Sequence, residues 1–386
     1  RLRRGFGIVA LGVAGCGRAA APTAPGAASA AGEFGLVAGA PVVTERTVLI
    51  GSDFEAGARG DGARTGAEIT ALEPAAVAWR FSAGSPTPGV VVGRDGTVYV
   101  PTHEGHVEAL SAEGGLRWAY NVQTPAVGAV VTPDGVLVVG TQEGRLHALR
   151  PDGTRLWSLQ APFPITTDLV PGAHCFTLFG DRSGAVVAVD GFGAVRGRWP
   201  ISEPFGAPPV ALPGGGVAAL GAEGRLFWLG AGPQRSLVLG SAPGSELMAG
   251  AGGDLLALAG SALVVVRDGA VVLRLPGVVG AVARGDGFVT VGPEPVLAFR
   301  SRAGEVVVEH PLVAPPSAAP VVDSGGVVHV ATTTGALVVA TTAGVRAWQV
   351  AARALLRPLL DPARGRVILA SGDGSVVAVA AAGLSP

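Results

Sequence analysis

Few side chains in this sequence are spaced for chemistry, and two histidines come closest. His103 and His106 flank Glu104 and Gly105 in a short polar stretch between apolar runs. Two imidazoles three residues apart on a turn could share a metal ion, but a zinc site needs further ligands, and none follows at a suitable spacing. The pattern therefore favours a solvated turn, and we assign no metal ligand here.

A second group of possible ligands is acidic. Asp53, Glu55 and Asp61 lie in or beside the glycine-rich stretch Phe54 to Gly66 and could offer oxygen atoms to Ca²⁺. Their spacing lacks the ligand register of a recognised calcium loop. Whether a metal occupies this stretch stays open at this point, and no ligand is assigned.

Glycine-rich and catalytic motifs point away from an enzyme. Gly191 to Gly197, GFGAVRG, is close to a dinucleotide fingerprint, but it has one residue too many and no helical pattern follows. It predicts a β-hairpin. Lysine is absent, which excludes Schiff-base chemistry and a lysine-based phosphate loop. Without a nucleophile motif or a paired-carboxylate arrangement, we predict no catalytic residue.

The composition indicates a folded, turn-rich β protein. The 386 residues include 61 glycines and 30 prolines, and the glycines recur at turn positions between valine-rich runs. A formal net charge of -1 offers no basic surface for nucleic acid.

The first 33 residues carry an export signal. Arg1, Arg3 and Arg4 precede a weakly apolar stretch of eleven residues, Gly5 to Gly15, which is too short to span a bilayer as a helix. Val13-Ala14-Gly15-Cys16 resembles a bacterial lipobox, which implies acylation of Cys16. Residues 1–16 are thus the predicted signal peptide and 17–33 a flexible Ala/Pro/Gly tether. Arg3-Arg4-Gly5-Phe6 also resembles the twin-arginine export pattern, so the choice of export route stays open.

Cysteine usage fits this interpretation. After Cys16 the sequence contains only Cys175, which lies in the apolar run His174 to Phe179. We predict a buried, inert thiol rather than a reactive or metal-binding one.

One repeat organises the rest of the chain, residues 34–386, into a single predicted domain. In Gly128 to Leu159, three turn signals separate four short apolar runs: A (Gly128 to Thr132), B (Val136 to Gly140), C (Arg145 to Leu149) and D (Thr154 to Leu159). The unit recurs about every 38 residues, which is typical of propellers. Five tryptophans fall in D runs, and we expect all five at one position, packing between blades: Trp79, Trp118, Trp157, Trp199 and Trp348. Apolar residues near Leu239, Leu273 and Val308 take their place in the other units.

The number of blades depends on how the ring closes. The chain ends with an A, B and C set and no D run, so an N-terminal strand must complete the last blade. If Val77 to Phe81 supplies that strand, the propeller has eight blades. If Phe34 to Ala38 supplies it, Pro41 to Phe81 forms a ninth. We predict eight.

The repeat resembles the pyrroloquinoline-quinone-type (PQQ-type) propeller repeat, most closely at Gly140 to Leu149 and Asp152 to Trp157. With the lipobox and tether, the chain resembles the BamB-like lipoproteins of outer-membrane β-barrel assembly. This resemblance implies a non-catalytic, lipid-anchored scaffold that binds envelope proteins, possible barrel-assembly components among them, as a monomer within a complex. Gly17 after Cys16 implies the outer membrane, facing the periplasm.

Two other functions remain as alternatives. One is a sensor or adhesin that binds a small molecule or a polysaccharide in the funnel, and the other is a degenerate quinoprotein dehydrogenase. Enzymatic relatives bind their quinone with a vicinal cysteine pair that this sequence lacks, so we predict no cofactor. In BamB-like proteins a loop bearing leucine and arginine contacts the partner, but the loops Gln160 to Asp168 and Ser202 to Pro208 lack that string. No partner contact is carried over, and function is expected where the repeats differ.

Overall fold

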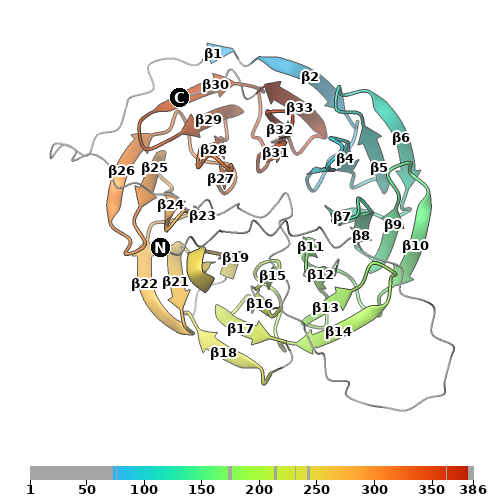
Figure 1. Ribbon diagram of the computed structural model, residues 1–386, viewed down its shortest axis with the longest axis horizontal. Helices are drawn as coiled ribbons and strands as arrows, with labels where there is room; N and C mark the ends of the chain where they lie inside the picture. The colour runs from blue at the N-terminus through green and yellow to red at the C-terminus, as the bar shows by residue number, and fades with distance from the viewer. Residues whose placement is uncertain are drawn as a thin grey trace, which may run out of the picture.

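The computed structural model describes residues 73–74, 76–172, 176–212, 215–230, 232–240, 244–361 and 363–380. Its strands form eight four-stranded antiparallel blades around a ring, and a fifth strand adds to one of them (Figure 1). The predicted eight-bladed propeller is therefore confirmed. The described residues include one short 3₁₀ helix, Ala251–Gly253. No helix in these ranges has the length and apolar character needed to cross a membrane.

Blades 1 to 4 follow one another along the chain, and each runs from an inner to an outer strand. Blade 1 contains β3 (Val91–Val92), β4 (Val98–Pro101), β5 (His106–Leu110) and β6 (Leu116–Asn121). Blade 2 contains β7 (Ala126–Val131), β8 (Leu137–Thr141), β9 (Arg145–Leu149) and β10 (Arg155–Gln160). Blade 3 contains β11 (Val170–Pro171), β12 (Thr177–Gly180), β13 (Ala185–Val189) and β14 (Val195–Pro200). Blade 4 contains β15 (Val210–Ala211), β16 (Val217–Leu220), β17 (Arg225–Leu229) and β18 (Arg235–Val238).

Blades 5 to 8 complete the ring. Blade 5 contains β19 (Gly244–Ala249), β20 (Leu255–Ala259), β21 (Ala262–Arg267) and β22 (Ala270–Pro276). Blade 6 contains β23 (Gly280–Arg284), β24 (Gly287–Val291), β25 (Val296–Arg300) and β26 (Val306–Pro311). Blade 7 contains β27 (Val321–Val322), β28 (Val328–Ala331), β29 (Ala336–Ala340) and β30 (Val345–Gln349), with β1 (Glu73–Pro74) added outside. Blade 8 contains β31 (Leu359–Asp361), β32 (Arg366–Ala370), β33 (Ser375–Ala380) and β2 (Val77–Ser82).

Ring closure follows the first of the two predicted solutions. β2 pairs with β33, joining Val77 to Val379 and Ser82 to Ser375, so it is the outer strand of blade 8. This arrangement gives eight blades and contradicts the nine-blade alternative. The segment Phe34 to Ala38, which that alternative required, lies outside the described residues.

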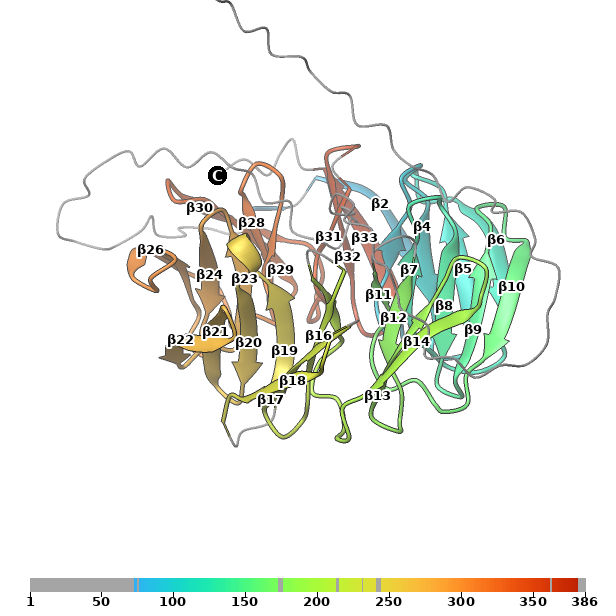
Figure 2. The same cartoon turned by 60° about the horizontal axis from the view of Figure 1, so that its bottom comes forward.

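The core lies between the blades. Eight clusters of buried aliphatic and aromatic residues each join two neighbouring blades. In the cluster between blades 1 and 2, for example, Tyr99 and Val107 pack with Leu137 and Val139. Burying one such side chain stabilises the fold by roughly 1.5–3 kcal/mol. Alternate side chains of a middle strand thus pack in two different interfaces, as for Leu137 and Val138 of β8. Figure 2 shows the neighbouring blades side by side around the ring.

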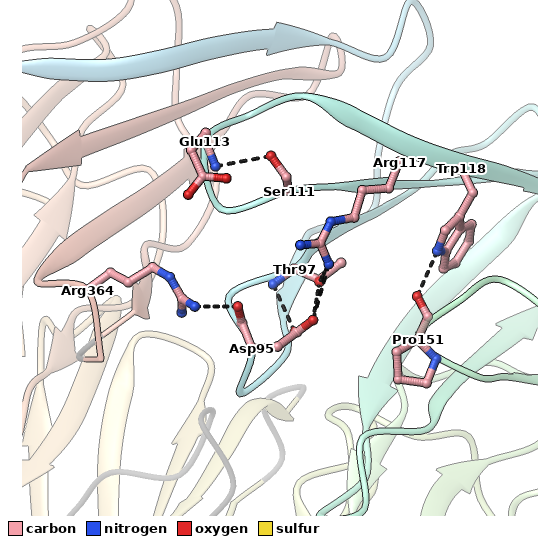
Figure 3. A network of polar contacts seen from close by, with 8 residues as sticks. All are labelled: Asp95, Thr97, Ser111, Glu113, Arg117, Trp118, Pro151 and Arg364. Atoms are coloured by element: carbon pink, nitrogen blue, oxygen red, sulfur yellow. Dashed lines mark hydrogen bonds and ion pairs between the residues drawn. The ribbon is translucent and has the colours of Figure 1, made fainter.

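Polar contacts also link successive blades. Arg364 of blade 8 donates a hydrogen bond to the Asp95 carbonyl of blade 1 (Figure 3). The Asp95 carboxylate accepts hydrogen bonds from the backbone N–H of Thr97 and from Arg117, at 3.0 and 3.3 Å. The Trp118 indole then donates to the carbonyl of Pro151 in blade 2, at 2.9 Å. One network therefore runs from blade 8 through blade 1 to blade 2.

Candidate functional site

The loops that lead from one blade to the next carry the clearest differences between the repeats. In five of them, a proline carbonyl accepts a hydrogen bond from the turn between the second and third strands of the next blade. The pairs are Pro86 with His103, Pro125 with Gln142, Pro164 with Arg182, Pro204 with Ala222, and Pro315 with Thr333. We call the residue just before this proline the pre-proline position. It is occupied by Ser85, Thr124, Phe163, Glu203 and Ala314.

Phe163 places an exposed aromatic ring at this position, in the predicted loop Gln160 to Asp168. Its side chain is 41% exposed, and the Arg198 guanidinium lies 5.2 Å from the centre of its ring. Arg198 belongs to β14 and also bonds the fully buried carboxylate of Asp181, with Nη2 2.9 Å from Oδ2. The buried Asp181 therefore holds Arg198, and Arg198 in turn supports the exposed ring of Phe163.

Glu203 occupies the same position one loop later, in the predicted loop Ser202 to Pro208. Its side chain is 8% exposed, and neither carboxylate oxygen makes a hydrogen bond of normal geometry to a described residue, although the backbone N–H of Glu223 stabilises its charge. A β-carbon at Gly221 would lie 2.1 Å from Glu203 Oε1, so in this conformation the carboxylate occupies the space beside Gly221 that a side chain would take. Burial raises the pKa of Glu203, and the charge of Glu223 adds to the increase. The loops that lead into blades 3 and 4 thus carry, at equivalent positions, an exposed aromatic ring supported by an arginine and a buried acid.

Glu203→Gln should stabilise the protein at neutral pH. Because the folded-state pKa is raised, ionisation of Glu203 opposes folding, and stability is lost as the pH rises through that pKa. We expect the free energy of unfolding at pH 7 to increase by about 1 kcal/mol, and the gain to vanish near pH 4. Urea denaturation of the native protein and of Glu203→Gln at pH 7 and pH 4 measures this difference in the free energy of unfolding.

The matched control for this substitution is Glu143→Gln, which neutralises an exposed glutamate at the same turn position of blade 2 as Glu223 has in blade 4. It should change stability by less than about 0.5 kcal/mol. A loss of stability in Glu203→Gln at pH 7 would show that the ionised carboxylate contributes to folding.

A second polar feature joins two blades that are not neighbours in the ring. Glu246 lies on β19, the inner strand of blade 5, and Arg357 lies just before β31, the inner strand of blade 8 (Figure 1). Arg357 Nη1 is 3.5 Å from Glu246 Oε1. Burial raises the pKa of Glu246, and the Arg357 charge opposes this increase. The two side chains thus form an ion pair between the inner strands of blades 5 and 8.

The five predicted tryptophans occupy two positions rather than one. Trp79, Trp118 and Trp157 share one position, and each pairs with an alanine that lies one residue before the last paired residue of the neighbouring strand. Each donates its indole N–H to the next blade. In blade 3 that position is Gly197, and Trp199 lies two residues later. Trp348 also occupies this later position, opposite Leu337. The expectation of one common position is therefore wrong for Trp199 and Trp348.

The glycine at position 197 explains how blade 3 tolerates the change. A β-carbon there would lie 2.2 Å from Cη2 of Trp199, so the indole covers the space beside Gly197. The longer spacing of 42 residues between Trp157 and Trp199 reflects this shift. Trp199 still packs in the cluster between blades 3 and 4.

The other sequence candidates do not come together in a reactive site. Gly191 to Gly197 lies at the hairpin between β13 and β14, as predicted. His103 and His106 lie in and beside the turn that leads into β5, and no group of three or more metal-binding side chains occurs within the described ranges. Cys16, Cys175, residues 17–33 and the stretch Phe54 to Gly66 lie outside the described residues.

The fold defines a class: an eight-bladed β-propeller of four-stranded antiparallel blades. Residues 65–214 match the family model described as outer membrane protein assembly factor BamB, which confirms the resemblance in the sequence. No curated protein shows a significant sequence match.

Solved structures show the same fold at low sequence identity. BamB from Moraxella catarrhalis superposes with a TM-score of 0.62 at 18% identity, covering 79% of this chain and 99% of that chain. The C-terminal WD40 domain of Sif2 gives 0.67 at 14% identity, with 80% and 99% coverage. Sqt1 from Saccharomyces cerevisiae gives 0.68 at 10% identity, also with 80% and 99% coverage. These three structures share the propeller architecture with this chain.

Proposed function

We propose that this protein is a non-catalytic scaffold of the bacterial cell envelope that binds protein partners in outer-membrane β-barrel assembly. The observation that carries the proposal is the group formed by Phe163, Arg198 and Asp181. An exposed aromatic ring is supported by an arginine whose own position is set by a buried acid. Such a group is ordered before a partner arrives, so binding orders few additional side chains.

The chemistry of this group suits a protein partner. Aromatic residues and arginine are enriched at the residues that dominate binding energy in protein interfaces. Glu203, one loop further on, adds a buried acid that a partner's donor could satisfy. At the inner strands of blades 5 and 8, by contrast, Glu246 and Arg357 form an ion pair with each other. This pairing leaves less charge there to bind a small-molecule ligand.

The assembly role rests on similarity. The family model for BamB matches residues 65–214, a range that includes Phe163, Asp181, Arg198 and Glu203. The BamB-like fold supports a role in protein interaction. From these similarities we infer that the partners are components of the barrel-assembly machinery.

Membrane attachment is part of the proposal. The lipobox-like sequence Val13 to Cys16 supports acylation of Cys16, and residues 17–33 would serve as the tether between lipid and propeller. Gly17 supports the outer membrane as the final location. We therefore place the protein on the periplasmic side of that membrane, as a monomer within a complex.

Phe163→Ala should reduce co-purification of barrel-assembly components from crosslinked membranes to about a tenth of the native level, an interface loss of about 1.4 kcal/mol. Phe192→Ala is the matched control, because Phe192 is an exposed phenylalanine in a hairpin of the same blade. Cys16→Ser, run in parallel, should move the protein from the membrane to the soluble fraction.

Three results would count against these statements. If the native protein recovers no barrel-assembly component, the assembly role is wrong. If Phe192→Ala reduces recovery as much as Phe163→Ala, the loop group is not the binding site. If Cys16→Ser stays in the membrane fraction, the lipid anchor is wrong.

A further inference from the structure

The outer strands of the blades differ in one backbone feature. In six blades, an extra residue interrupts the pairing of the outer strand near its beginning, forming a β-bulge. These outer strands are β2, β6, β10, β14, β22 and β26. A bulge bends and twists an edge and disturbs its row of hydrogen-bonding groups, which discourages another strand from pairing there.

Two outer strands have no bulge. β30 pairs with β29, and β18 pairs with β17, each in a continuous register. β30 already has a strand on its outer edge: β1 runs parallel to it, with Glu73 beside Trp348 and Pro74 beside Gln349. The chain itself therefore shows that an unbulged outer strand of this propeller accepts a further strand.

β18 has the same regular edge, and its only strand partner in the described part of the chain is β17. The N–H of Leu239, just after β18, bonds the carbonyl of Gly224 and continues the pairing with blade 4. Because antiparallel pairing alternates along a strand, the main-chain groups of Ser236 and Val238 point the other way, to the open edge. They form the row that an added strand would use.

The side chains around this edge suggest what kind of strand fits. Val238 is 63% exposed and pairs with the exposed Arg225 of β17, and the exposed Arg235 lies three residues earlier on β18. Residues 225–240 contain these two arginines and no acidic residue. Cross-strand neighbours of opposite charge and of apolar type stabilise pairing.

We propose that the outer edge of β18 binds an extended segment of a partner protein in which aliphatic and acidic residues alternate. Main-chain hydrogen bonds to Ser236 and Val238 hold the segment, an aliphatic side chain covers Val238, and a carboxylate faces Arg235. The inference deepens the proposed scaffold function and rests on it for the existence of a partner. It assigns a second contact, on the rim of the ring, apart from the Phe163 loop.

Proline substitution tests this edge directly. Ser236→Pro removes an open-edge N–H while leaving the pairing with β17, and edge strands tolerate proline. Ser158→Pro is the matched control, because Ser158 on β10 faces the third residue of its neighbouring strand, as Ser236 does on β18, and is likewise exposed. The two variants differ in the edge: β10 is bulged and β18 is not.

The probe is a fluorescein-labelled peptide of sequence SEVTVEVTS, titrated with the purified protein and followed by fluorescence anisotropy. Ser236→Pro should weaken binding at least about tenfold, and Ser158→Pro should change it less than about twofold. Replacing both glutamates of the peptide by lysine should also weaken binding about tenfold. Arg235→Glu is the second variant, used if Ser236→Pro does not fold by circular dichroism.

Absence of peptide binding to the native protein would overturn the inference, and so would equal weakening by Ser158→Pro and Ser236→Pro. Peptide-independent dimers in sedimentation that disappear in Ser236→Pro would assign the edge to a second copy instead. The proposed function is judged separately by co-purification with Phe163→Ala. Recovery of assembly components together with failed peptide binding would therefore refute only the edge site.

Discussion

Trp79→Ala is expected to lower the free energy of unfolding by about 3–5 kcal/mol. Trp79 is 9% exposed and packs in the cluster between blades 8 and 1. Its indole Nε1 donates to the carbonyl of Ala112 at 2.8 Å, and its ring covers Gly114, where a β-carbon would lie 2.6 Å away. The substitution leaves a cavity at the interface where the ring closes. Equilibrium urea denaturation measures the loss.

Trp118→Ala is the control, because Trp118 occupies the same strand position between blades 1 and 2. Its ring is half-buried rather than buried, so the expected loss is smaller, about 1–2 kcal/mol. Equal losses in the two variants would mean that the closing interface contributes no more than an ordinary one. A loss below about 1 kcal/mol in Trp79→Ala would contradict the predicted cavity.

Asp254→Asn is expected to cost about 2 kcal/mol at pH 7. Arg267 of the same blade bonds the Asp254 carboxylate at 2.9 and 2.8 Å, and Arg302 of blade 6 bonds it at 3.1 and 2.9 Å. The hydrogen bonds from Arg267, with those from Arg302, lower the pKa of Asp254 to about 2 against the opposing effect of burial. The asparagine cannot replace this charge.

The sign of the pH effect follows from that lowered pKa. Asp254 contributes stability above its ordinary pKa of 3.8, and the contribution is lost as the pH falls toward 2. The difference between native protein and Asp254→Asn should therefore shrink from pH 7 to pH 3. Asp190→Asn, which removes a contact with the exposed Arg196 within one blade, should cost less than about 1 kcal/mol. A pH-independent difference for Asp254→Asn would refute the argument.

Much of the fold could be predicted because turns and alternation are local signals. The predicted C strand, Arg145 to Leu149, has the same bounds as β9. The predicted D strand, Thr154 to Leu159, differs by one residue at each end from β10, Arg155–Gln160. The first strand was less well placed: it begins at Ala126 rather than Gly128, where a bulge interrupts the pairing. Closure by Val77 to Phe81 could be proposed because a ring needs a partner for its last edge.

The side-chain contacts could not be predicted in the same way. The spacing of Trp199 and Trp348 shows that a D strand is present, but strand register decides which way each indole faces. The two loops were singled out because the repeats differ there, yet the sequence does not show that Phe163 meets Arg198 or that Glu203 lies beside Gly221. The pairing of Glu246 with Arg357 depends on how far apart the blades stand across the ring.

The pairing of β2 with β33 also sets the order in which the ring can be made. β2 is among the first described segments of the chain, and its partner ends at Ala380, so the two strands are almost the whole sequence apart. A chain that emerges from its N-terminus has β2 without that partner until nearly all other blades exist. Because contacts between distant segments form slowly, closure is expected to be the late step of folding. Until then the unclosed ring presents two unpaired strand edges, a state that is prone to aggregation.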